Sequence, residues 1–331
     1  MANHKSPVSI GLPVFNGEKY LKEAVNSILA QTFQDFELII SDNASTDNTQ
    51  RICQEYVAND SRVRYYRYEK NIEAPKNFNR VFDLSSGEYF KWAADDDVLA
   101  PQYLEKCVNV LSEDPSVVLC HSITGRIDEN GLLVGICNKG LLRRIDSEKP
   151  HERFGDLIGL FHNACPLLGL GRRSAFEKSR LLGNYIGADR NLLAEIGLMG
   201  KIHEIPECLF FLRDHPGSYT STFYGTDRSM SLDRLRKEMD WWSKNDWTSF
   251  PHWKTCSEYF KSVNRVRLNW SERLYCYDQI FRWIMHEDWT FLGVDLELFL
   301  LNRSKLARKL IPFTILKLKQ AVIPFTKKIM Q

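Results

Sequence analysis

Short apolar runs alternate with helical patterns of apolar residues through the first third of the chain. The run Val8–Leu12 is followed by apolar residues at helical spacing from Tyr20 to Leu29, and then by a second run, Phe36–Ile40. This succession predicts a βαβ unit. A polar turn over residues 42–47, rich in residue types that cap helices, predicts the start of a further helix that extends to Tyr56.

The same alternation continues to about residue 121. Further strands are predicted at Val63–Tyr68, Tyr89–Trp92 and Val117–His121, with a helix over Asn77–Leu84 between the first two. Strands that alternate with helices at this spacing form a mostly parallel sheet, Rossmann-like, with helices on both faces. Ligands of such sheets bind beyond the carboxyl ends of the strands, so we expect the chemistry just after each strand.

The pattern changes in the second half of the chain. From about Arg126 to Phe161 it weakens, which favours loops or a small antiparallel excursion, and helical spacing returns over Leu192–Leu198. Seven of the eight tryptophans lie between Trp241 and Trp289, where the composition favours helices. We therefore expect an α/β part over residues 1–220 and a helical C-terminal region over residues 221–331.

The C-terminal tail is basic, whereas the rest of the chain is mildly acidic. All eight charged residues after Glu297 are lysine or arginine, so an overall net charge of +2 leaves −6 on the chain before them. Aliphatic residues alternate with the basic ones, which predicts binding to the inner membrane surface, with docking on the protein's own body as the alternative. A nucleic-acid partner is not expected, because few of the interleaved residues are aromatic.

Composition and cysteine usage are those of an ordinary folded protein in a reducing compartment. The 331 residues are 44% hydrophobic and 26% charged, and the eight cysteines lie far apart without a CxxC pair. We find neither a signal-peptide apolar region at the first residues nor 18 uninterrupted apolar residues elsewhere. The expected location is cytoplasmic, or peripheral on the inner face of the cell membrane.

The sharpest chemical feature is a run of three acids, Asp95, Asp96 and Asp97, directly after a predicted strand. Carboxylates this close repel one another, and a cluster that is partly buried needs a cation or hydrogen-bond donors to neutralise it. A divalent ion held by one or two carboxylates and by phosphate oxygens would do so. The alternative is that the acids cap the helix that Pro101 begins.

Two residues that follow the first two strands have candidate roles in binding a nucleotide. Asp42 follows the strand Phe36–Ile40, where a carboxylate can accept hydrogen bonds from a ribose or a base. Its alternative role is that of a turn residue. Phe15 follows the first strand and is either a stacking platform for a base or a core residue.

The order of these elements resembles the opening of family 2 glycosyltransferases. The resemblance is carried by Val8–Gly17, Ser27–Phe33, Phe36–Asp47, Gly87–Tyr89 and the acids with Pro101, in order and at the family's distances. It covers roughly residues 8 to 125. It implies a GT-A fold, a nucleotide-diphosphate sugar donor, a divalent metal such as Mn²⁺ or Mg²⁺, and a nucleotide-sugar-binding, catalytic domain over residues 1–220.

The resemblance also implies roles for residues at matching positions. Phe15 would stack on the base, the backbone near Pro13 and the side chain of Asp42 would hold it, and Glu18 would lie close to the nucleotide. Within the acidic run, Asp96 would be the metal ligand. Asp95 would lie near the ribose and Asp97 beside the metal. Lys76 would be the basic residue that the family has near the donor. Ala94 stands where the family usually has the first acid, which leaves the division of labour within the run open.

Two downstream segments continue the resemblance. Gly187–Arg190 is similar to the family's catalytic Glu-Asp segment, with Ala188 in place of the glutamate, so Asp189 is the candidate general base. Its alternative role is to cap the following helix. The segment from Arg213 to His215 resembles the family's Arg-x-His element. The arginine would bind a diphosphate and the imidazole a metal, with a surface loop as the alternative.

Together these features predict an inverting glycosyltransferase that takes its sugar from a nucleotide-diphosphate donor, with uridine diphosphate as the family's preferred nucleotide. The acceptor would be a saccharide or a lipid-linked saccharide in surface polysaccharide synthesis. A metal-dependent sugar nucleotidyltransferase is one alternative, although the first loop lacks a glycine-rich, basic phosphate-binding sequence. A non-catalytic membrane-surface binding protein is the other.

Overall fold

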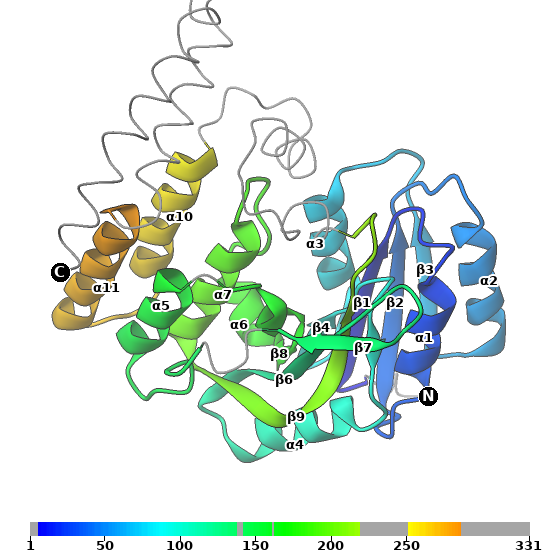
Figure 1. Ribbon diagram of the computed structural model, residues 1–331, viewed down its shortest axis with the longest axis horizontal. Coiled ribbons are helices and arrows are strands. Elements are labelled where there is room, and N and C mark those ends of the chain that lie inside the picture. Colours follow the sequence, from blue (N-terminus) through cyan, green and yellow to red (C-terminus); the bar gives the residue numbers. More distant parts are fainter. Residues whose placement is uncertain (1–5, 138–141, 161, 219–250, 286–331) are drawn as a thin grey trace, which may run out of the picture.

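The protein is described from a computed structural model, which covers residues 6–137, 142–160, 162–218 and 251–285. Its centre is one sheet with strand order β3-β2-β1-β4-β8-β6-β9-β5, and β7 pairs with β6 at the side (Figure 1). The strands are β1 Val8–Val14, β2 Phe36–Asp42, β3 Val63–Arg67, β4 Tyr89–Trp92, β5 Val98–Leu99, β6 Val117–Ile127, β7 Leu133–Ile136, β8 Leu170–Arg172 and β9 Lys201–Arg213.

The helices connect and cover these strands. They are α1 Leu21–Leu29, α2 Thr49–Asn59, α3 Ala74–Leu84, α4 Tyr103–Glu113, α5 Pro150–Gly159, the 3₁₀ helix η1 Cys165–Leu168, α6 Arg173–Lys178, α7 Ala188–Met199, α10 Pro251–Arg265 and α11 Trp270–Trp283. The predicted strands and helices of the first third are all present, with ends that differ by a few residues.

The first four strands are parallel, as the alternating pattern predicts. β1 pairs in parallel with both β2 and β4, and β2 pairs in parallel with β3. The remainder is mixed: β8 is antiparallel to β4 and to β6, whereas β6 is parallel to β9. The short antiparallel excursion expected after residue 126 is the pairing of β6 with β7.

Side-chain alternation along β1 divides the core into two layers. Val8, Ile10, Leu12 and Val14 point to one face, where they pack with residues of α1 and α4. The other face packs against α3, so closely that a Cβ on Gly11 would lie 2.6 Å from Val81 Cγ2. This close approach holds α3 against the sheet. Because β1, β2 and β4 are parallel, the loops that follow them lie at one edge of the sheet.

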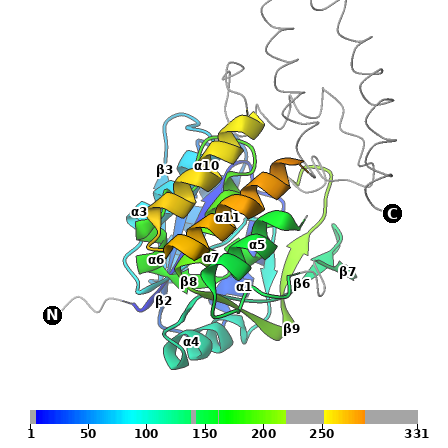
Figure 2. The same ribbon diagram turned by 90° about the vertical axis from the view of Figure 1, so that its left-hand side faces the viewer.

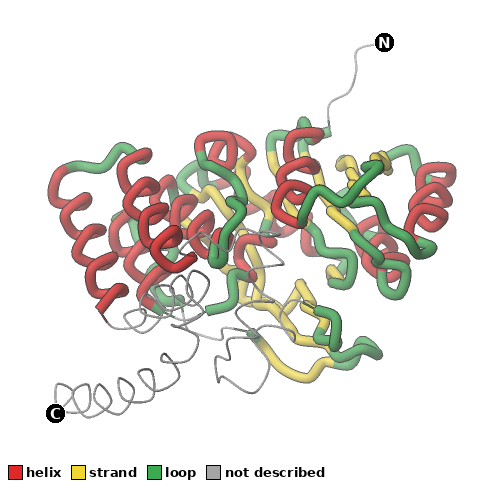
Figure 3. Tube along the Cα trace, turned by 90° about the horizontal axis from the view of Figure 1, so that it is seen from above, coloured by secondary structure: helices red, strands yellow, loops and turns green. Residues whose placement is uncertain are grey.

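The described part of the C-terminal region is helical, as predicted. α10 and α11 pack beside α5 and α7 at the end of the molecule away from β1–β3 (Figures 2 and 3). Glu195 of α7, 1% exposed, accepts hydrogen bonds from Arg265 Nε and Nη2 at 2.7 and 2.6 Å. The predicted division between residues 220 and 221, and the basic tail, lie outside the described residues.

Helix α5 was not expected from the sequence. It lies inside the segment where the hydrophobic pattern weakens. The pattern is weak there because the buried positions of α5 include the charged residues Arg153 and Asp156. The Asp156 carboxylate accepts hydrogen bonds from the Arg144 side chain, and Arg153 donates to the carbonyls of Gly197 and Ser147. Buried charges that are paired in this way hide a helical period from an analysis of apolar residues alone.

No helix among the described residues has the length and apolar character needed to cross a membrane. None of the eight cysteines, all of which lie in the described ranges, is part of a disulfide. Seven of them are buried, as expected of core cysteines.

Candidate active site

The three consecutive acids lie in the loop between β4 and β5, at the carboxyl edge of the parallel strands. β4 pairs with β1 and β5 pairs with β9, so the loop is held at both ends. Asp97 is 6% exposed, and its Oδ1 accepts a hydrogen bond from the Arg213 backbone N–H at 3.0 Å. Its Oδ2 is buried without a hydrogen-bond partner among the described residues. A buried, unpaired carboxylate oxygen is costly unless a cation or a donor meets it.

Burial and mutual repulsion disfavour charge in this loop. Desolvation and the neighbouring Asp96 raise the pKa of Asp95 to about 8, and the same two causes raise the pKa of Asp97 well above its ordinary value. Asp95 also lies against the first loop, where a Cβ on Gly17 would meet its Oδ2. The loop is therefore a place where a positive charge would be strongly favoured.

Asp96 is paired with the predicted histidine. Its Oδ2 lies 2.9 Å from His215 Nε2, and the imidazole ring lies 4.8 Å from the ring of Tyr20. His215 Nε2 is the ring nitrogen that faces the carboxylate, and the Gly217 N–H donates to Nδ1 at 3.2 Å. The two side chains that were expected at the metal thus lie side by side.

The Asp96 and His215 pair fits a small divalent ion. Neighbouring ligands of an octahedral ion with bonds of about 2.1 Å lie about 3.0 Å apart, close to the observed 2.9 Å. No cluster of three or more His, Cys, Asp or Glu side chains with the geometry for a metal occurs among the described residues. Waters and phosphate oxygens would therefore complete the shell, as is usual for Mg²⁺.

Arg213 has a different environment from the one expected of a diphosphate ligand. The residue is 1% exposed; its Nε donates to the Asp96 carbonyl at 2.8 Å, and its Nη2 lies 2.7 Å from Glu23 Oε2. Its guanidinium also lies over the Tyr20 ring, at 4.8 Å from the centroid. Through these contacts, Arg213 fixes the positions of the acidic loop and β9 relative to α1. Binding of a diphosphate by Arg213 stays a prediction.

The loops after β1 and β2 are joined by hydrogen bonds around the predicted nucleotide residues. The Asn16 N–H donates to Ser45 Oγ at 2.9 Å, and Asn16 Oδ1 accepts from the Thr46 N–H at 2.8 Å. Glu18 Oε2 accepts from the Asn48 N–H at 2.9 Å, so this carboxylate stabilises the start of α2.

Phe15 and Pro13 stand on either side of the strand end. Phe15 projects from the joined loops and is 49% exposed, whereas Pro13 is buried in β1 beside Ser41. An exposed aromatic ring next to a rigid double loop is a suitable platform for a planar base. This environment excludes the alternative that Phe15 is a core residue.

Asp42 is completely buried at the end of β2. Its Oδ1 accepts from the Ser45 N–H at 2.8 Å and its Oδ2 from the Tyr65 hydroxyl at 2.7 Å, with Arg67 Nε 3.3 Å from Oδ2. Burial, and then the hydrogen bond to Asp42, raise the pKa of Tyr65. Asp42 thus orders the loop that would face a nucleotide, which is the turn role that the sequence left open. A direct contact with a base stays a prediction.

Lys76 lies on the surface of α3 and is not among the residues that line the pocket of the acids. Its Nζ pairs with Glu73 Oε2 at 2.9 Å, and its side chain is 60% exposed. Glu73 has a positive φ of 77°, unusual for a residue other than glycine, directly before α3 begins. A role of Lys76 at a donor stays a prediction that no contact among the described residues supports.

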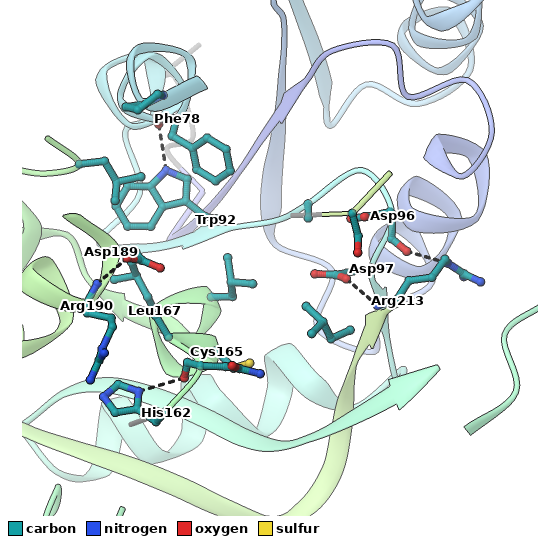
Figure 4. Close-up of a pocket in the computed structure, with 18 residues that line it drawn as sticks. Phe78, Trp92, Asp96, Asp97, His162, Cys165, Leu167, Asp189, Arg190 and Arg213 are labelled. Atoms are coloured by element: carbon teal, nitrogen blue, oxygen red, sulfur yellow. Dashed lines mark hydrogen bonds between the residues drawn. The ribbon is translucent and has the colours of Figure 1, made fainter. Parts of the chain in front are cut away.

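Asp189 shares a pocket with the acidic loop. It lies in the first turn of α7, and its Oδ1 accepts from the Arg190 N–H at 2.8 Å. Asp96, Asp97, Arg213 and Asp189 all line one cavity of about 220 Å³, and Figure 4 shows Asp189 across that cavity from the two acids. Burial raises the pKa of Asp189. The fold therefore brings together carboxylates that lie more than 90 residues apart in the sequence.

Several residues of the site were not anticipated from the sequence. Tyr20 contacts both His215 and Arg213, and Tyr65 with Arg67 supports Asp42. The last two are at alternate positions of β3, beside β2 in the sheet, so they share a face. The alternate spacing of Tyr65 and Arg67 in β3 could therefore have pointed to them in the sequence. No pattern in the sequence pointed to Tyr20, because its partners are Arg213 at the end of β9 and His215 just after it.

Solved structures identify the fold class. S. aureus TarS 1-349 in complex with UDP superposes with a TM-score of 0.57 at 14% identity, covering 85% of this chain and 72% of that chain. The mannosyltransferase PcManGT from Pyrobaculum calidifontis, in complex with GDP-Man and Mn²⁺, gives 0.55 at 13% identity, covering 94% and 80%. The chain has the GT-A fold, as predicted.

The sequence comparison gives the family. The model described as "Glycosyl transferase family 2" matches residues 9–179, and the chain belongs to this family. Chondroitin synthase from Escherichia coli is 37% identical over 127 residues, which are 38% of this chain and 18% of that protein. Glycosyltransferase GlyG from Streptococcus pneumoniae serotype 4 is 34% identical over 113 residues, 34% of this chain and 38% of the relative. The chain thus matches well under half of the length of these relatives.

Proposed function

We propose that the protein is an inverting glycosyltransferase that moves a sugar from a nucleotide-diphosphate donor, with UDP as the nucleotide, to the hydroxyl of a saccharide or lipid-linked acceptor. The observation that carries the proposal is the single pocket that joins Asp96 and Asp97 to Asp189. Membership of family 2 and the UDP in the TarS complex support the choice of donor.

The donor would lie across the edge formed by the loops after β1, β2 and β4. Phe15 stacks on the base, and the backbone at Pro13 with the loop that Asp42 orders holds the nucleotide. Asp95 would face the ribose, and Asp96, which lies beside His215, would hold the divalent metal with it, with Asp97 close to the metal. Mn²⁺ or Mg²⁺, when bound, supplies positive charge that stabilises the diphosphate leaving group.

Asp189 acts as the general base. Its carboxylate removes the proton from the acceptor hydroxyl as that oxygen attacks the anomeric carbon and the bond to the diphosphate breaks. Burial, which raises its pKa, makes Asp189 a stronger base than an exposed aspartate. General bases contribute about 10²–10⁴-fold to a rate. Attack from the side opposite the diphosphate inverts the anomeric carbon.

The reaction is assigned to surface polysaccharide synthesis at the cytoplasmic face of the cell membrane. The support is the sequence of the basic tail between Arg303 and Lys328, which lies outside the described residues. Vesicle sedimentation of the full chain with anionic and with neutral vesicles tests this part separately. Equal binding to both would contradict it.

A donor panel tests the proposal. Nucleotide-sugars are incubated with the protein and Mn²⁺ or Mg²⁺, and the released nucleotide diphosphate is measured with and without a chelator. One donor should be consumed in a metal-dependent manner. Release of pyrophosphate from UTP and a sugar 1-phosphate would instead favour the nucleotidyltransferase. No turnover and no nucleotide binding, with vesicle binding intact, would favour the membrane-binding protein.

A further inference from the structure

Three basic side chains surround one buried carboxylate on α10. Glu258 is 2% exposed and is paired with Lys254 and Lys261 of the same helix and with Arg180, which follows α6. The Nζ atoms of Lys261 and Lys254 lie 2.8 and 3.1 Å from Glu258 Oε1, and Arg180 Nη1 lies 3.1 Å from Oε2. Although burial opposes ionisation, these contacts lower the pKa of Glu258 to about 2. The carboxylate is therefore charged, and three cations against one anion leave the group with a net positive charge.

The cations of this group exceed what the buried carboxylate needs. One cation is enough to balance Glu258, yet three are present. The side chains of Arg180, Lys254 and Lys261 are 58%, 44% and 50% exposed, and none of the three is paired with a second carboxylate of the described residues. Each also has more N–H donors than its contact with Glu258 uses. Exposed donors with an excess of positive charge are suited to a phosphate group, which offers several charged acceptor oxygens.

Two exposed aromatic residues accompany the lysines along α10. Trp253 and Phe260 directly precede Lys254 and Lys261 in the sequence, and their spacing of seven residues places both rings on one face of the helix. The two side chains are 51% and 36% exposed. The helix therefore presents a row of cations beside a row of apolar rings. This arrangement matches an amphiphile with a phosphate head and an apolar chain better than it matches a free anion.

The basic group lies beside the segment that carries the proposed base. Thr255 of α10 donates from its Oγ1 to the Ile186 carbonyl at 2.7 Å, just before α7 and its Asp189. On the other side of the same segment, Arg180 comes two residues before Leu182, which lines the pocket together with Asp189. The acids that would hold the metal and the donor diphosphate lie across the pocket from Asp189 (Figure 4). The cations are therefore on the side from which an acceptor would reach the base.

We propose that Arg180, Lys254 and Lys261 bind the phosphate or diphosphate group of a lipid-linked acceptor, whose apolar chain lies along Trp253 and Phe260. The inference rests on the proposed function, because it takes the acceptor hydroxyl to meet the base of α7. The acids at one end of the pocket and the cations at the other would then hold two different phosphate groups, that of the donor through a metal and that of the acceptor directly.

Farnesyl diphosphate, a short lipid diphosphate, is the probe for this site. Calorimetry of the full chain, with a chelator present to keep the acidic loop free of metal, compares it with farnesol and with inorganic pyrophosphate. Farnesyl diphosphate should bind about tenfold or more tighter than either, because it alone engages both the cations and the rings. This comparison uses the wild-type protein and does not depend on any variant.

Two variants then test the lysines. Lys254→Gln and Lys261→Gln should each weaken the binding of farnesyl diphosphate by about fivefold or more, since each removes a charged hydrogen-bond donor. Each variant keeps two cations beside Glu258, so the buried carboxylate stays paired. Arg282→Gln removes an exposed cation of α11 and is the control, which should bind like the wild type.

Three results would overturn the acceptor site while UDP still binds with Mn²⁺, and so would leave the proposed function intact. The first is equal affinity for farnesol or for pyrophosphate, which would remove the role of the cations or of the rings. The second is wild-type binding of farnesyl diphosphate by both lysine variants, and a loss confined to anionic vesicles would instead assign the cations to a membrane surface. The third is displacement of farnesyl diphosphate by UDP with Mn²⁺, which would place the probe at the donor site. Failure of UDP to bind would overturn the proposed function, and the acceptor role with it.

Discussion

The Asp96 carboxylate and the His215 imidazole lie 2.9 Å apart although 119 residues separate them in the chain. Two strands create this proximity. β5 follows the acidic loop and pairs with the end of β9, and His215 comes two residues after β9. The Arg213 side chain and backbone then fasten the same loop through Asp96 and Asp97. The sheet thus aligns one acid and one imidazole as a pair of ligands.

Removal of either member of this pair should abolish metal-dependent donor binding. His215→Gln and Asp96→Asn each remove one protein ligand, and the loss of Mn²⁺-dependent affinity for UDP should exceed the about 10–100-fold typical of residues that only orient a metal ligand. Titration calorimetry with and without Mn²⁺ measures it. His203→Gln, on the same strand β9 but outside the pocket, should bind like the wild type. Equal affinities for all variants would contradict the metal assignment.

Phe15→Ala should weaken nucleotide binding without affecting the fold. Stacking of a base on an aromatic side chain is worth about 1–3 kcal/mol, so the affinity for UDP should fall by about fivefold or more. The matched control is Phe281→Ala on α11, where the ring is 61% exposed and distant from the acids. Stacking by Phe15 would be refuted by a variant whose Kd for UDP stays within twofold of the wild type.

Much of the fold could be predicted because its first third obeys simple patterns. Val8–Val14 and Phe36–Asp42 are buried at almost every position, as in a parallel sheet covered on both faces, and the helix between them shows regular apolar spacing. α5 could not be predicted, because its buried face contains Arg153 and Asp156. The charge pairs that permit this are visible only in three dimensions.

Some residues of the site could be predicted from the sequence and others could not. Asp96, Asp97 and Asp189 are recognised from motifs that follow strands or begin a helix, and the structure brings them to one pocket. The burial of Arg213 and the surface position of Lys76 could not be predicted, because a motif does not specify how far a side chain is from solvent.

The rate should depend on pH through Asp189. The base acts only when ionised, and burial raises its pKa above the ordinary 3.8. The acid limb of kcat/KM should therefore lie at higher pH than an exposed aspartate would give, with the rate falling about tenfold per unit below it. A pH profile of the wild type checks this. The residual rate of Asp189→Asn should lack that limb, and an unchanged limb would assign it to another group.

The raised pKa of Asp189 also predicts that replacing this residue by asparagine stabilises the folded state, although the same substitution lowers the rate. A buried carboxylate that must ionise at neutral pH destabilises the folded state, and this cost disappears below the pKa of the unfolded chain. Asp189→Asn should therefore melt at a higher temperature than the wild type at pH 7, with the difference shrinking towards pH 4. Calorimetric Tm values at both pH values measure it. A lower Tm at pH 7 would contradict the burial argument.

Docking of α10 on α7 should depend on Arg265. Its removal leaves the buried Glu195 carboxylate uncompensated, and breaking a buried pair in this way costs about 3–5 kcal/mol, with the lower end expected because Arg265 is 27% exposed. Urea unfolding of Arg265→Met measures the loss. Arg282→Met removes an exposed pair with Asp278 and should cost under about 1 kcal/mol. Equal costs would show that the Glu195 pair does not secure α10.

The assignment of Asp189 as the base opposite the acidic loop is the central claim, and one comparison tests it most directly. Transfer or hydrolysis of the preferred donor is followed by NMR for the wild type and for Asp189→Asn, with UDP affinity measured on the same samples. The account predicts a product of inverted anomeric configuration from the wild type. It also predicts a rate about 10²–10⁴-fold lower for the variant, at unchanged UDP affinity. A retained configuration, or a variant that turns over at the wild-type rate, would contradict it.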